Sequence, residues 1–169
     1  MKKFVIFLLS VISFVLCAGE KTVFEAKSIS DWGGAVRKTT FHDGVFDTGM
    51  DQFVVISKQP IKIQPGKEYT LSGDFKLKPY APFSNIYFGL DVYDAAGKGI
   101  KRLYIGKSPY NDRVAPGNNQ QVRNFWLTFS GSIKSEAFPK NAAFFKVIIH
   151  QFENYIVDMY FKNIKVTEK

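Results

Sequence analysis

The sequence has very little cysteine and histidine, and this scarcity excludes several kinds of chemistry. The one cysteine, Cys17, lies in an N-terminal apolar segment, so a chain that loses this segment has no disulfide. Thiolate zinc sites and cysteine–histidine nucleophilic catalysis are then excluded as well. The two histidines, His42 and His150, show no spacing that indicates a metal site. Stability must therefore come from a hydrophobic core, which roughly 150 residues can supply.

Long hydrophobic runs are equally scarce, and the longest one lies at the N-terminus. After Lys2 and Lys3, residues 4–16 form an apolar run that is too short to span a bilayer. The small residues at 17–19 follow, an order typical of a signal peptide. We therefore predict a signal peptide over residues 1–19, a single folded domain over 20–169, no transmembrane segment, and a secreted or periplasmic protein.

Cys17 allows one alternative, in which it becomes the acylated first residue of a lipoprotein. The preceding residue, Leu16, disfavours this processing, which normally needs a small side chain at that position.

Positively charged residues are in moderate excess over negatively charged ones. The chain has 23 Lys and Arg against 15 Asp and Glu, a formal charge of +8, and loss of Lys2 and Lys3 would lower it to +6. Many lysines alternate with apolar residues, as Lys62 does between Ile61 and Ile63, which is typical of the solvated face of a strand. An exported protein meets little nucleic acid, so we expect no nucleic-acid partner.

Motifs of catalysis are also missing. The sequence has no Gly-x-Ser-x-Gly, no His-Glu-x-x-His and no glycine-rich phosphate loop. Pairs of carboxylates such as Asp91 and Asp94 occur, but a β-protein with 15 acidic residues shows such pairs without a glycosidase site. We therefore predict that the protein is not an enzyme and that it needs no cofactor.

What the sequence does contain is an alternation of apolar and polar residues with period 2. Residues 69–78 and 85–94 show it best, with Tyr69, Leu71 and Phe75 on one side of the first segment. Further strands are predicted at 53–56, 100–106, 125–133, 144–150 and 155–166. Roughly ten such strands separated by turn signals predict an all-β protein, an antiparallel β-sandwich of the jelly-roll type.

Five segments also carry short motifs in a fixed order: Phe24-Glu25 followed by Trp32, residues 65–76 (PGKEYTLSGDFK), 92–98 (VYDAAGK), 126–133 (WLTFSGSI) and 160–166 (YFKNIKV). Together they resemble the jelly-roll carbohydrate-binding modules of families 4, 9 and 22, which have a galactose-binding-domain-like fold. The resemblance spans nearly the whole chain after the signal peptide. It implies a lectin-like, carbohydrate-binding protein in which Trp32 and Trp126 are packing residues.

One departure from these modules concerns calcium. In relatives, an aspartate of the last strand helps the glutamate near the start to hold a structural calcium ion, and this chain has Lys162 at that place. The resemblance therefore implies that Lys162 pairs with Glu25 instead of the metal. We expect no calcium or other metal there.

A sugar-binding surface needs aromatic side chains for the apolar faces of the sugar and polar groups for its hydroxyls. The non-core face of three predicted strands supplies both if they share one sheet, as in the resembling modules, and Gly89 would leave an open spot among them. The predicted carbohydrate-binding residues on this face are Tyr87, Asp91, Tyr93, Arg102, Tyr104, Lys146 and His150.

The long connection over residues 106–124 is a second candidate site, since long loops in compact domains are often functional. Its best aromatic residue is Tyr110, after Pro109. The leading function is a secreted, non-catalytic module that binds a glycan or polysaccharide. The alternatives are a structural or adhesion domain that binds a cell-surface protein, and a small lyase or hydrolase on the same sandwich.

Overall fold

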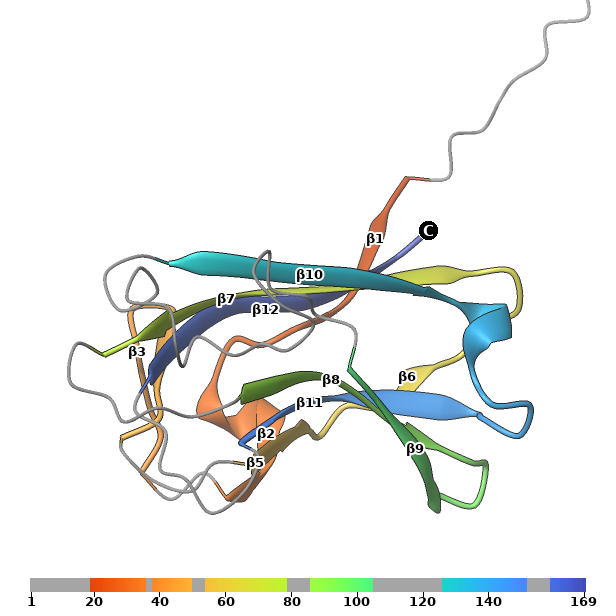
Figure 1. Cartoon of the computed structure of the whole chain (residues 1–169), viewed down its shortest axis with the longest axis horizontal. Helices are drawn as coiled ribbons and strands as arrows, with labels where there is room; N and C mark the ends of the chain where they lie inside the picture. The colour runs from red at the N-terminus through yellow and green to blue at the C-terminus, as the bar shows by residue number, and fades with distance from the viewer. Residues whose placement is uncertain (1–18, 36–37, 50–53, 79–85, 105–125, 152–158) are drawn as a thin grey trace, which may run out of the picture.

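The computed structural model describes residues 19–35, 38–49, 54–78, 86–104, 126–151 and 159–169. In these ranges the chain forms twelve strands in two antiparallel sheets, with 3₁₀ turns at Ile29–Asp31 and Ser135–Ala137. Figure 1 shows the sheets as two layers, with β10, β7 and β12 in one and β8, β11 and β9 in the other. This confirms the predicted antiparallel β-sandwich. Residues 1–18 of the predicted signal peptide lie outside the described residues.

The first sheet, sheet A, is built around the long strand β12. β12 pairs with β7 on one side, and with both β4 and β1 on the other. In order across the sheet, the strands are β10 (Leu127–Lys134), β7 (Glu68–Leu77), β12 (Met159–Glu168), β4 (Val45–Asp47) and β3 (Thr40–His42), with β1 (Lys21–Glu25) also on β12.

The second sheet, sheet B, is built around β11. β11 pairs with β8 on one side and with β5 and β6 at different heights on the other. In order, the strands are β2 (Trp32–Ala35), β5 (Val54–Ser57), β11 (Phe144–Gln151), β8 (Ile86–Tyr93) and β9 (Gly99–Tyr104), with β6 (Ile61–Lys62) also on β11.

The core between the sheets is rich in aromatic rings. Trp32 of sheet B is 2% exposed and meets Phe46 and Phe161 of sheet A edge to face, with centroids 6.2 and 6.1 Å apart. Tyr69 is fully buried, and its hydroxyl donates to the Lys62 carbonyl at 3.1 Å. Edge-to-face contacts are a favourable geometry for large aromatic rings. Among the described residues, the buried indole N–H of Trp32 has no hydrogen-bond partner, so its place in the core rests on ring packing. Trp32 is thus a packing residue, as predicted.

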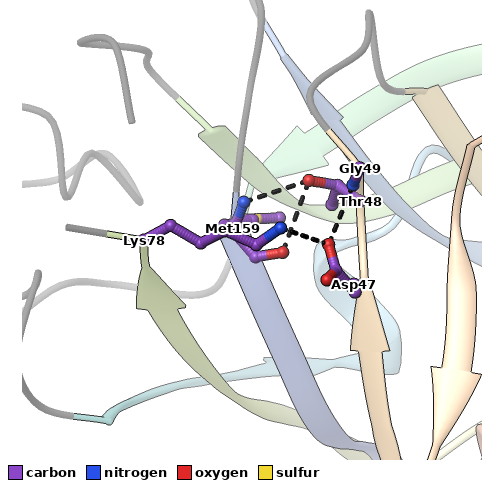
Figure 2. A network of polar contacts seen from close by, with 5 residues as sticks. All are labelled: Asp47, Thr48, Gly49, Lys78 and Met159. Atoms are coloured by element: carbon purple, nitrogen blue, oxygen red, sulfur yellow. Dashed lines mark hydrogen bonds and ion pairs between the residues drawn. The ribbon is translucent and has the colours of Figure 1, made fainter. Parts of the chain in front are cut away.

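A network of hydrogen bonds and an ion pair connects strand ends at one end of sheet A, as Figure 2 shows. The Thr48 hydroxyl, buried behind β4, accepts from the Met159 N–H at 3.0 Å and donates to the Met159 carbonyl at 3.3 Å. Beside it, the Lys78 ammonium lies 2.8 Å from the Asp47 carboxylate. Lys78 follows β7, so this network ties together the ends of β4, β7 and β12.

Candidate functional site

The outward side chains of β11, β8 and β9 form one surface, the outer face of sheet B. Phe88, Leu90 and Val92 point into the core, so the residues between them on β8 point outward. The register of the three strands then places outward residues in rows across the sheet. From one end to the other, the rows are His150 and Tyr87; Ile148, Gly89 and Tyr104; Lys146, Asp91 and Arg102; Phe144, Tyr93 and Gly99.

Three aromatic rings lie together at the end of this face that begins with the row of His150 and Tyr87. Tyr87 lies 4.7 Å from Tyr104 and 5.1 Å from His150, measured between ring centroids. The Tyr104 hydroxyl lies 2.7 Å from His150 Nε2. Burial raises the pKa of Tyr104, so its phenol stays neutral and donates to Nε2 when the imidazole carries its proton on Nδ1. His150 is 6% exposed while Tyr104 is 41% exposed, so Tyr104 presents the accessible ring of the cluster.

The central row is charged. Arg102 holds Asp91 with two bonds, Nε to Oδ1 at 2.6 Å and a terminal nitrogen to Oδ2 at 3.1 Å. This hydrogen-bonded carboxylate raises the pKa of Arg102. Lys146 lies opposite Asp91 on β11, with its ammonium 5.7 Å from the centroid of the Tyr93 ring. The row thus holds two cations and one anion.

A second pair of rings lies at the other end of the face. Tyr93 stacks on Phe144 with centroids 5.1 Å apart and planes 9° from parallel. Burial, and then the negative charge of Asp91, raises the pKa of Tyr93. Beside Tyr93, an open hollow of about 300 Å³ is lined by Asp91, Arg102 and the start of β9. The face therefore has a ring group at each end and a charged row between them.

Gly89 is not the open spot that the sequence predicts. It is buried, and a Cβ there would lie 2.1 Å from the Leu103 carbonyl oxygen and 2.9 Å from the Tyr104 Cα. Since this Cβ would point outward, the backbone of β9 curls over the outer face at this position. Glycine lets the edge of the sheet bend and so brings Tyr104 over the face toward His150.

We expect Gly89→Ala to destabilise the fold and to displace Tyr104. The methyl group meets backbone atoms that cannot rotate away, so β9 must move, at a cost of about 1–3 kcal/mol in the free energy of unfolding. Urea denaturation measures the cost. Gly33→Ala in the same sheet is the matched control, because its Cβ would lie 3.7 Å from the nearest atom, an ordinary contact. Equal stability of the two variants would contradict this role of Gly89.

The structure brings together seven of the eight predicted binding residues, those of β8, β9 and β11. Tyr110 and the loop 106–124 lie outside the described residues. Sequence reasoning missed Phe144, which shares the outward side of β11 with Lys146 and His150. Ile148 lies on the same side but is fully buried. The alternation that assigned Lys146 to this side assigns Phe144 and Ile148 to it as well, so the signal was present.

The predicted ion pair between Glu25 and Lys162 is not formed. The register of β1 and β12 places Glu25 opposite Lys165, and the Glu25 carboxylate lies 3.0 Å from Lys27. The Lys162 ammonium instead lies 4.3 Å from the centroid of the Trp126 ring. A bulge at Asn163, with φ of 54°, separates Lys162 from the part of β12 that meets β1.

Two further features concern the described residues. In those ranges no three His, Cys, Asp or Glu side chains gather in a way that could hold a metal ion. Within the same part of the chain, no helix has the length and apolar character needed to cross a membrane.

The described fold is the jelly-roll sandwich of carbohydrate-binding modules, as comparison with solved structures shows. No family model and no curated protein matches the sequence.

Three solved structures illustrate this similarity. One holds the CBM22-1 and GH10 modules of endo-1,4-beta-D-xylanase 10B from Clostridium thermocellum, complexed with xylohexaose: TM-score 0.57, 16% identity, 89% of this chain and 28% of that chain covered. The CBM22-2 xylan-binding domain of Xyn10C from Paenibacillus barcinonensis superposes with a TM-score of 0.53 at 10% sequence identity. The match covers 89% of this chain and 99% of that domain. A further CBM22 xylan-binding domain has a TM-score of 0.52 at 13% sequence identity. The match covers 86% of this chain and 94% of that domain. At these identities the similarity defines the fold.

Proposed function

We propose that this protein is a secreted, non-catalytic module that binds carbohydrate through the outer face of sheet B. The observation that carries the proposal is the cluster of Tyr87, Tyr104 and His150, in which the exposed Tyr104 ring stands beside the charged central row. This arrangement supplies both groups that a sugar needs, an aromatic surface and polar partners.

The chemistry of each group follows from its surroundings. The Tyr104 ring is fixed by its bond to His150, so it loses little side-chain entropy when a sugar packs against it. The Asp91 carboxylate and the Arg102 guanidinium hold each other in one orientation, which leaves their remaining lone pairs and N–H groups for hydroxyls. A face whose polar groups are already oriented binds at a lower entropic cost.

The similar solved structures support the same proposal. The three described above come from proteins described as xylan-binding or complexed with xylohexaose. The absence of catalytic motifs in the sequence supports a binding role, and the N-terminal signal-peptide pattern supports export.

Affinity electrophoresis tests the proposal. The purified protein is run in native gels that contain xylan, β-glucan, galactan, mannan or pectin, with bovine serum albumin as the reference for mobility. We expect retardation in at least one gel, and no release of reducing ends when the same polymer is incubated with the protein. Unchanged mobility in every gel would overturn the binding function, and release of reducing ends would overturn the non-catalytic part.

A further inference from the structure

The central row of the face carries a positive charge that its own residues do not neutralise. Each oxygen of Asp91 accepts a hydrogen bond from Arg102, although Lys146 is the residue directly opposite Asp91 on β11. The described residues place no carboxylate in ion-pair contact with Lys146, whose ammonium stands over the Tyr93 ring. Of the two cations in the row, Arg102 is thus paired and Lys146 is the one available to an anion.

The two ring groups flank this charge along the same strand. Tyr87 and Tyr93 are six residues apart on β8, roughly 20 Å at the rise of an antiparallel strand. Asp91, at the register of Lys146, lies between them. A single sugar unit cannot reach both ring groups, whereas a chain of sugars that lies along β8 contacts both and crosses the charged row.

We propose that the ligand is a polysaccharide that carries anionic substituents, and that Lys146 binds one of them at the central row. The inference rests on the proposed carbohydrate-binding function and adds the class of polymer. A neutral chain packed over this row would take water away from the Lys146 ammonium without replacing it, which is costly. A carboxylate or sulfate on the chain removes that cost and forms a charge-assisted hydrogen bond.

The test uses one polymer with and without its charge. Glucuronoxylan and its carboxyl-reduced form share a backbone, so their dissociation constants in affinity electrophoresis isolate the carboxylate. We expect the native polymer to bind about tenfold more tightly, since a hydrogen bond to a charged group is typically worth that factor or more. A parallel pair, dextran sulfate and dextran, distinguishes a sulfate from a carboxylate as the anionic group.

Variants locate the effect at Lys146. Lys146→Met keeps the aliphatic stem and is expected to weaken binding of the anionic polymer about tenfold, while binding of its neutral form changes less than about twofold. Lys146→Arg, which keeps the charge, is expected to restore binding. Lys165→Met is the matched control, because Lys165 is an exposed residue of β12 in sheet A and its loss changes the net charge equally.

The outcomes separate the two proposals. Tighter binding of either anionic polymer, lost in Lys146→Met alone, supports the inference. Equal binding of charged and neutral polymers, or equal losses in Lys146→Met and Lys165→Met, overturns the inference and leaves the binding function standing. Failure to bind any polymer overturns both.

Discussion

The double variant Tyr87→Ala/Tyr104→Ala is expected to lose all measurable retention on the polysaccharide that the wild-type protein binds. The two rings contact each other with centroids 4.7 Å apart, and both rest against His150, so their removal erases the aromatic surface at that end of the face. Truncation of a central aromatic contact typically costs about 2 kcal/mol or more. Two such losses weaken binding by about a thousandfold, which affinity electrophoresis registers as unretarded migration.

Two controls show whether the loss belongs to the site. Tyr104→Phe keeps the ring and removes only the hydroxyl that meets His150, so we expect retention to fall only a fewfold. Tyr160→Ala removes a half-buried ring from β12 in the opposite sheet, and retention is expected to stay unchanged. Circular dichroism confirms that each variant is folded. Full retention in a folded double variant would contradict the placement of the binding site on this face. It would leave the description of the fold unchanged.

The long strands were predictable because burial on one side leaves a strict period of two. Tyr69, Leu71 and Phe75 are all fully buried, as their alternation predicts. The same rule placed Tyr87, Asp91 and Tyr93 on the opposite side of β8 from Phe88, and so predicted the outer face. In β7 and β8, periodicity therefore predicts which side chains share a surface.

Three of the short strands, β3, β4 and β6, were not predictable in this way. β3 and β4 have three residues each and β6 has two, too few to show a period. They are held in place by partners far away in the sequence, as β4 is by β12. For such segments, pairing with a distant strand decides the structure, and local sequence carries little of that information.

Register and bending were the other limits. The Glu25–Lys162 pairing was taken from the positions of the two residues in the resembling modules, whereas the register of β1 on β12 places Glu25 opposite Lys165. At Gly89, the sequence showed a missing side chain but not which backbone would approach it. Both features depend on how two strands cross in space, which alternation alone does not determine.

We expect Phe75→Ala to lower the free energy of unfolding by about 3–5 kcal/mol, the range for a buried phenylalanine. Phe75 is fully buried on β7, where its ring meets Phe129 of the same sheet at 5.2 Å and Phe88 of sheet B at 5.1 Å. The variant therefore opens a cavity where the two sheets join. Urea denaturation at equilibrium measures the loss, and an unchanged slope shows that both proteins unfold from equally compact states.

Phe75→Leu is the control for this variant, because leucine fills most of the space and is expected to cost about 1.5 kcal/mol. A loss below about 1 kcal/mol in Phe75→Ala would contradict the packing described for the core. Since Phe75 points between the sheets and not onto the outer face of sheet B, the folded variant should retain polysaccharide as the wild type does. Phe75→Ala is thus expected to lose stability and keep its binding, whereas Tyr87→Ala/Tyr104→Ala is expected to lose binding and stay folded. The two results differ because the core and the candidate site lie on opposite sides of sheet B.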